Sequence, residues 1–144
     1  MTKALLEKAT EYCVAHQYRL TKPRLTVLKI IASSGKPLSA YEVLEKLGKT
    51  LPNPKPPTAY RAIEFWQGQG FVHRIESLNA YVICHAGHLH QGGQFMICDD
   101  CGTVIEAHLC NLPKQLQDTA KKNTFHAESW NLEIHGLCEE CQSH

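Results

Sequence analysis

In the first half of the chain, apolar residues recur every three or four positions, as they do along one face of an α-helix. The pattern predicts four helices, over residues 3–17, 21–34, 39–47 and 58–68. Thr21 can cap the second helix, with Pro23 in its first turn, and Ser39 and Glu42 have the spacing of a capping box. These signals set the predicted helix starts.

The third and fourth helices are joined by a proline-rich stretch, residues 52–57, which predicts a stiff extended link. On the fourth helix one face is apolar and is expected to pack inward: Ala59, Ala62, Ile63 and Trp66. Tyr60 and Arg61 fall on other faces. A capped helix, a turn and a second helix that displays Tyr and Arg is the layout of a helix-turn-helix, although two ordinary packed helices would show the same pattern.

A β-hairpin is predicted directly after the fourth helix. Residues 71–75 and 80–84 are rich in β-branched and aromatic side chains and flank a turn-like segment. If the chain turns at Leu78-Asn79, Ser77 faces Ala80 and His73 faces Cys84. The hairpin would be the wing of a winged helix.

The second half of the chain is predicted to form a smaller unit that contains both strands and a helix. Residues 87–93 break all periodicity, and strands are then predicted within 94–108 and 130–135, with a helix over 112–123. The predicted fold class is α+β, with an N-terminal winged helix-turn-helix domain (1–85), a hinge (86–93) and a C-terminal α/β domain (94–144).

Composition and charge agree with this division. The 144 residues are 43% hydrophobic and 20% charged, no apolar run is long enough for a membrane span, and no signal-peptide pattern occurs, so we expect a cytoplasmic protein. Residues 1–85 hold twelve Lys and Arg against six Asp and Glu, whereas residues 86–144 hold three against eight. A basic half beside an acidic half fits one module for an anionic polymer and another for a different task.

Four of the seven cysteines form two C-x-x-C pairs, Cys98 with Cys101 and Cys138 with Cys141. Each pair can chelate one side of a tetrahedral ion, and four thiolates leave no open position, which is typical of structural zinc. A redox dithiol would need only one pair. The sequence therefore predicts a structural zinc site.

A second group of ligands is more scattered along the chain. His73 and Cys84 share the predicted hairpin, His88 and His90 follow in the hinge, and Glu106 ends a later strand. On their own, His73 and Cys84 would be explained by side-chain packing within the hairpin. Together these side chains offer a mixed N/S/O set, in which the soft thiolate favours zinc over iron or manganese.

Several segments of the chain resemble the ferric uptake regulator family, and within it the zinc uptake regulator branch. Two of these segments contain His73 and Cys84. The matching segments, in order, are Leu20-Thr-Lys-Pro-Arg24, Leu38-Ser-Ala-Tyr41, Pro57-Thr-Ala-Tyr-Arg61-Ala, Gly70-Phe-Val-His73, Tyr81-Val-Ile-Cys84-His85, Phe95-Met-Ile-Cys98 and Gly136-Leu-Cys138. The resemblance implies a homodimer whose C-terminal domain serves dimerisation. It implies structural zinc on the four C-x-x-C thiols, and a sensor zinc on His73, Cys84, a loop histidine (His90 rather than His88) and Glu106.

The expected function is a zinc-responsive transcriptional repressor of zinc uptake genes, not an enzyme, which binds operator DNA as a dimer loaded with two zinc ions per chain. The resemblance matches Tyr41 and Arg61 to base-contacting positions. The full set of candidate DNA-contacting residues is Tyr41, Thr58, Tyr60, Arg61, Lys22, Arg24 and Lys55.

Three other functions share some of these sequence features. An iron- or peroxide-sensing member of the same family is the runner-up, but Gly92-Gly-Gln-Phe95 stands where the iron-sensing branch has a histidine cluster. A zinc deaminase is suggested by His126-Ala-Glu128 with the last C-x-x-C pair, yet Leu137 replaces the proline of that signature. A zinc store would not need the basic winged half.

Overall fold

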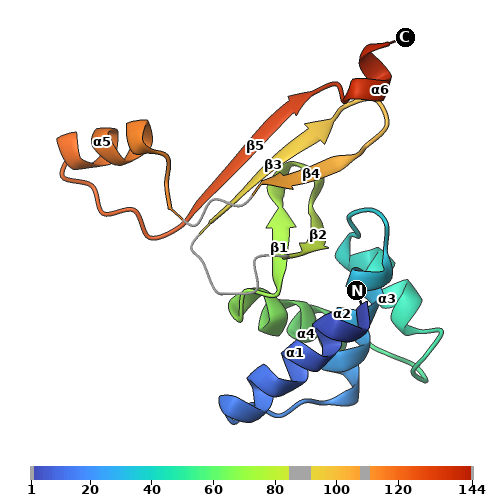
Figure 1. Ribbon diagram of the computed structural model, residues 1–144. Helices are drawn as coiled ribbons and strands as arrows, with labels where there is room; N and C mark the ends of the chain where they lie inside the picture. Colours follow the sequence, from blue (N-terminus) through green and yellow to red (C-terminus); the bar gives the residue numbers. More distant parts are fainter. Residues whose placement is uncertain (1, 85–91, 108–110, 144) are drawn as a thin grey trace. The chain divides into compact units, whose positions relative to one another are not determined.

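The computed structural model describes residues 2–84, 92–107 and 111–143. The chain divides into two compact units, residues 1–87 and 88–144 (Figure 1). Within the described ranges, every helix is too short or too polar to cross a membrane.

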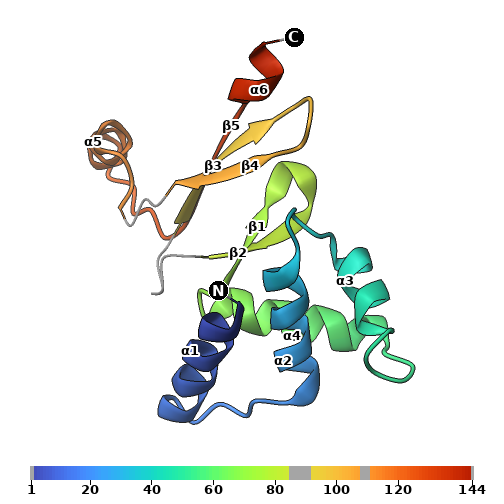
Figure 2. The ribbon, with the colours of Figure 1, turned by 45° about the vertical axis from the view of Figure 1, so that its right-hand side comes forward.

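The first unit holds four helices and a two-stranded sheet (Figure 2). Its elements are α1 (Thr2–Ala15), α2 (Lys22–Ser33), α3 (Ala40–Leu47), α4 (Pro56–Gly68), β1 (Val72–Ile75) and β2 (Ala80–Ile83). The predicted caps are confirmed: the Thr21 hydroxyl accepts the N–H of Arg24, and Ser39 and Glu42 form a full capping box. The predicted start of α4 at Thr58 is wrong by two residues, because prolines fit the first helical turn, where an N–H is not needed.

A single apolar core holds the helices of the first unit together. The inward face predicted for α4 is confirmed, since Ala59, Ala62, Ile63 and Trp66 are all buried. Trp66 satisfies its indole N–H by donating to the carbonyl of Arg24 at 2.7 Å, which ties α4 to α2. The structure thus fixes α4 against α2 while its opposite face stays in solvent.

The hairpin forms as predicted, but its predicted register is wrong. A short 3₁₀ turn over Glu76–Leu78 and a left-handed Asn79 (φ 49°) replace the two-residue loop, so His73 pairs with Val82 and Ile75 with Ala80. The shift is two residues, and side chains alternate with a period of two. His73 and Cys84 therefore keep the same face, as diagonal neighbours instead of a direct pair.

The second unit is a three-stranded sheet with two helices. Its elements are β3 (Gly92–Cys98), β4 (Val104–Ala107), α5 (Lys114–Lys122), β5 (Trp130–Gly136) and α6 (Glu139–Gln142). The strand order is β4-β3-β5, with β3 antiparallel to β4 and parallel to β5. A parallel neighbour requires a crossover, and α5 lies within it. Because β3 begins at Gly92, the last two positions of the predicted hinge belong to a strand; residues 86–91 lie outside the described ranges.

One face of this sheet carries an exposed apolar row. Met96 pairs with Ile105 on one side and with Ile134 on the other, and the three are 41%, 51% and 52% exposed. The alternate positions Phe95 and Ile97 are buried. Among its described residues the unit therefore buries few apolar side chains of its own.

Candidate metal centre and nucleic-acid interface

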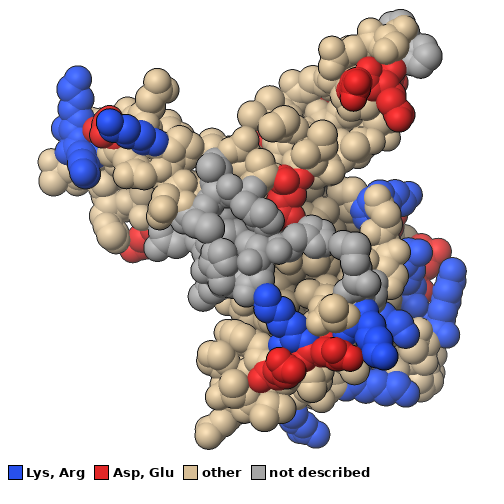
Figure 3. Space-filling view, in the orientation of Figure 1, with Lys and Arg blue, Asp and Glu red and all other residues tan. Residues whose placement is uncertain are grey.

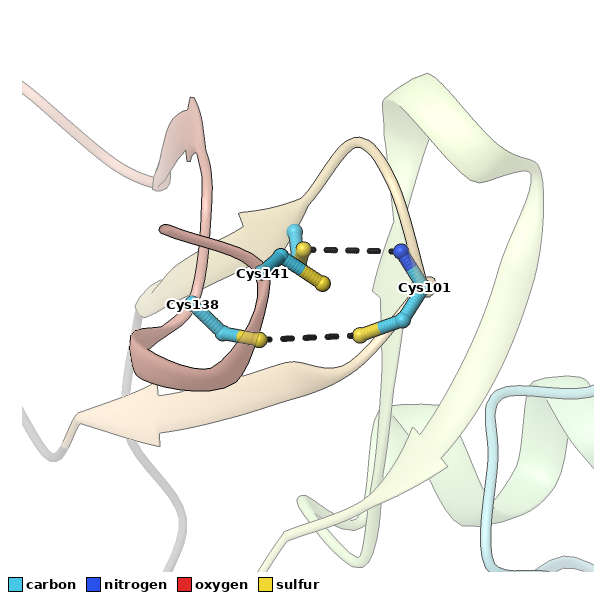
Figure 4. Close-up of side chains that lie close together, drawn as sticks. Cys101, Cys138 and Cys141 are labelled. Atoms are coloured by element: carbon cyan, nitrogen blue, oxygen red, sulfur yellow. Dashed lines mark hydrogen bonds between the residues drawn. The ribbon is translucent and has the colours of Figure 1, made fainter. Parts of the chain in front are cut away.

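The two C-x-x-C pairs come together at one end of the second unit. Cys98 ends β3, and Cys101 follows in a tight turn in which Gly102 has a φ of +79° and donates its N–H to the carbonyl of Cys98. Only glycine adopts that conformation without strain. Cys138 caps α6 and Cys141 lies within it. The thiols of Cys101, Cys138 and Cys141 point toward one another (Figure 4).

The spacing of the four sulfurs fits a tetrahedral metal ion. All four Sγ atoms lie within 4.8 Å of one another, and those of Cys101 and Cys138 are 3.7 Å apart. Four sulfurs at about 2.3 Å from a zinc ion are roughly 3.8 Å apart along each edge of the tetrahedron. The residues present therefore fit zinc.

The polar surroundings of these thiols favour the thiolate at two positions. Backbone N–H groups, first that of Cys101 and then that of Cys138, lower the pKa of Cys98 to about 6. The hydroxyl of Thr103, 3.0 Å from Cys101 Sγ, is the largest of the contacts that lower the pKa of Cys101. The pKa of Cys141 is raised, chiefly by the hydrogen bonds that its protonated thiol donates to the Cys138 and Cys98 sulfurs.

His73 and Cys84 form a second pair of potential ligands, in the first unit. A ring nitrogen of His73 and the Sγ of Cys84 lie within 4.8 Å of each other. Cys84 is 3% exposed, and its N–H donates to the carbonyl of Phe71, which continues the hairpin beyond β2. Two ligands on one hairpin face can bind one side of an ion.

The other candidate ligands of this set belong to other segments of the chain. Glu106 lies on β4 in the second unit, half-buried and paired in register with Phe95. His88 and His90 lie outside the described residues.

The exposed side of the helix-turn-helix carries the candidate base-contacting residues. Tyr60 and Arg61 lie in the first turns of α4 and are exposed, Tyr60 by 49%, and Thr58 is half-buried beside them. Tyr41, in the first turn of α3, is 74% exposed. Tyr side chains are enriched at binding interfaces, because they offer a large apolar ring together with a polar hydroxyl.

Basic side chains are also frequent on the first unit. Lys and Arg lie over its helices, together with some Asp and Glu, and on α5, and a group of Asp and Glu lies near α6 (Figure 3). Lys55 is the N-cap residue of α4. Lys22 lies on the wall of a groove of about 530 Å³ that also includes Lys29 and Lys46, and no carboxylate lines it. The first unit thus presents the cationic surface that a polyanion requires.

Arg24 is engaged within the protein. Its guanidinium lies over the ring of Phe65, 3.8 Å from the ring centroid, and donates to the carbonyl of Arg19 at 2.6 Å. It differs in this respect from the two lysine candidates, Lys22 and Lys55, whose side chains make no such contact with the residues that the structure describes.

Two polar contacts around the four-cysteine cluster were not predicted from the sequence. Thr103 accepts or donates a hydrogen bond at Cys101 Sγ, and His135 Nδ1 lies 3.2 Å from an Asp99 carboxylate oxygen. Thr103 could have been found from its position two residues after a cysteine ligand. His135 is brought to Asp99 only by the β3–β5 pairing, so its sequence position carries no signal.

Comparison with known proteins places these features in one family. The family model described as "Ferric uptake regulator family" matches residues 15–135. The chain is 39% identical to the zinc uptake regulation protein of Escherichia coli (strain K12) over 142 residues, 97% of this chain and 82% of that protein. It superposes with a TM-score of 0.92 on a solved zinc uptake regulator complexed with zinc and DNA, at 38% identity, covering 99% of this chain and 96% of the other. It is 26% identical to the peroxide-responsive repressor PerR of Staphylococcus saprophyticus over 127 residues, 86% of this chain and 82% of that protein.

Proposed function

Because this chain belongs to the ferric uptake regulator family, we propose that it is a zinc-responsive transcriptional repressor that binds operator DNA as a zinc-loaded homodimer. The observation that carries the proposal is the pairing, in one chain, of a four-thiol cluster and a pair formed by half-buried His73 and buried Cys84 with a helix-turn-helix that exposes Tyr and Arg. Its targets are zinc uptake genes, and it acts in the cytoplasm, where its operators are.

The four-cysteine cluster is the structural zinc site. Zinc bound there would offset part of the negative charge of four thiolates and add its binding energy to folding. Cys98 and Cys101 hold the β3–β4 turn, and Cys138 and Cys141 hold α6, so an ion bound by the four side chains would tie this turn to α6 at one end of the sheet.

The sensor zinc is held by His73, Cys84, His90 and Glu106, with His88 as the alternative loop ligand, which makes two zinc ions per chain. His73 and Cys84 already share a hairpin face. The remaining donors belong to the hinge and to β4. An ion that needs donors from both units restricts how they are arranged. If bound zinc raises the affinity for operator DNA by a given factor, bound DNA must raise the affinity for zinc by the same factor.

The sensed metal is zinc rather than iron. A buried thiolate at Cys84 is a soft ligand, which suits zinc, and the relatives named as peroxide repressors are less similar to this chain than the zinc regulators are.

A second copy of the chain covers the exposed apolar row of the second unit, formed by Met96, Ile105 and Ile134. In a two-fold dimer, the paired recognition helices reach successive major grooves when they are about 34–36 Å apart. Tyr41, Thr58, Tyr60 and Arg61 then face base edges, and Lys22 and Lys55 contact phosphates.

The experiment starts from DNA selected out of a random duplex pool by the zinc-loaded wild-type protein. Its binding is measured across buffered free zinc, with metal analysis of the purified protein. Wild type is expected to hold two zinc ions per chain and to bind the selected site more tightly when both are present, by a factor of about 5–150.

Cys84→Ser is the matched test of the sensor site, with Cys13→Ala as the control, because Cys13 is also a buried cysteine of the first unit. We expect Cys84→Ser to remain a folded dimer with one zinc per chain and to lose the zinc-dependent gain on the selected site. A Cys84→Ser protein that still binds two zinc ions and still responds to zinc would contradict the assignment of this site.

A further inference from the structure

Arg24 connects three segments of the DNA-binding unit. Its N–H donates to the Thr21 hydroxyl at 3.3 Å, and its guanidinium donates to the carbonyl of Arg19 at 2.6 Å. Its own carbonyl accepts the indole N–H of Trp66 at 2.7 Å. One residue thus joins the segment after α1, the start of α2 and the second half of α4.

The contact with Phe65 makes this connection sensitive to the orientation of α4. The guanidinium carbon lies 3.8 Å from the Phe65 ring centroid, which is cation–π geometry, and Tyr18 meets the same ring edge-on at a centroid distance of 5.4 Å. Phe65 is therefore held between a cation and an aromatic edge, and α4 cannot turn about its axis without breaking these contacts.

The rotation of α4 matters because Arg61 and Phe65 lie one helical turn apart on nearly the same face. Side-chain atoms lie about 5–6 Å from a helix axis, so a rotation of about 20° displaces them by about 2 Å. A hydrogen bond to a base edge does not survive such a displacement.

We propose that Arg24 is a positioning residue that holds α4 in the orientation in which Tyr60 and Arg61 meet base edges, and that it is not itself a phosphate contact. This inference rests on the proposed DNA-binding function and assigns one of its specificity-determining residues. Lysine cannot replace arginine in this role, because its point charge lacks the planar group that stacks on Phe65 and reaches the Arg19 carbonyl.

The two roles predict different salt dependence. A phosphate contact weakens binding to all sequences alike when it is lost, and it lowers the slope of log affinity against log salt by about 0.9. A positioning residue lowers affinity for the selected site only and leaves the slope unchanged. Lysine restores a phosphate contact but not a positioning role.

The experiment compares full-length, zinc-loaded R24K and R24Q with K22Q on random duplex DNA and on the duplex selected by wild type, at several salt concentrations. We expect R24K and R24Q to lose affinity for the selected site by about three- to thirty-fold, the range of a partly desolvated cation–π contact. Their binding to random DNA and their salt slope should match wild type, whereas K22Q should lose affinity for both duplexes and part of the slope.

A double-mutant cycle with F65L tests the stacking itself. F65L keeps an apolar side chain but removes the ring, so we expect R24K and F65L to cause similar losses and the double variant to lose no more than either single variant. Additive losses, or an R24Q slope reduced by about 0.9 and restored in R24K, would overturn the proposal. If wild type selects no sequence at all, the proposed function fails and this inference fails with it; if wild type selects a site, only the variants decide.

Discussion

Replacing Cys138 with serine is expected to unfold the second unit, because zinc bound by the four-cysteine cluster would supply more of its stability than its own core does. Cys138 caps α6, and its sulfur lies 3.7 Å from that of Cys101. Without it the four-thiolate shell opens, and zinc no longer joins α6 to the β3–β4 turn.

The magnitude follows from the small core. Within the described part of residues 88–144, the buried hydrophobic residues are Phe95, Ile97 and Cys98. Burying Phe95 and Ile97 contributes about 3–6 kcal/mol in total, at about 1.5–3 kcal/mol each. Structural zinc contributes about 10–16 kcal/mol in peptides that fold around one ion. Losing the zinc therefore removes the larger of the two terms.

The assay combines metal analysis, thermal melting followed by circular dichroism, and sedimentation. We expect Cys138→Ser to lose the structural zinc, to lose the sheet signal of the second unit, and to sediment as a monomer. Cys13→Ala is the control for the loss of one thiol, since Cys13 is buried in the core of the first unit and is not one of the four clustered cysteines. A metal-free Cys138→Ser protein that melts cooperatively at the wild-type temperature and stays dimeric would refute the reasoning.

Two further variants test the DNA-binding unit. Arg61→Ala is expected to weaken binding to the selected duplex by about 1–3 kcal/mol and to relax its sequence preference at one position per half-site, as measured by competition with single-base variants; equal losses on random DNA would make Arg61 a phosphate contact. Ser39→Ala is expected to lower the free energy of unfolding of the first unit by about 0.5–2 kcal/mol at neutral pH, because it removes the cap of α3. The Ser39 N–H and hydroxyl lower the pKa of Glu42, so the contribution of the Glu42 carboxylate, which Glu42→Gln removes, is present above the ordinary pKa of a glutamate and is lost as the pH falls through the lowered value. A difference in unfolding free energy between wild type and Glu42→Gln that stays constant from pH 7 to pH 3 would contradict the capping-box account.

Features that depend on neighbours a few residues away in the chain could be predicted from the sequence. The caps at Thr21 and Ser39 form between residues three apart, and the inward face of α4 follows from the helical repeat. Each C-x-x-C pair places two sulfurs on one short turn, so the chemistry of the zinc site could be predicted from spacing alone.

Features that depend on which strands and residues pair across the fold could be learned only from the tertiary structure. The wing register differs from the predicted one by two residues, because the conformation of Glu76–Asn79 decides which residues meet, while the shared face of His73 and Cys84 survives any even shift. The parallel pairing of β3 with β5 has no local signal, yet it brings the two C-x-x-C pairs to one end of the sheet.

The contact of Arg24 with Phe65 could not be predicted from the sequence. From the sequence, a basic residue beside a helix start is a candidate DNA contact, whereas the place of Arg24 against Phe65 depends on how α2 packs on α4. The free energy of such packing is spread over many side chains far apart in the chain, whereas a cap or a chelating pair is set by a few adjacent residues.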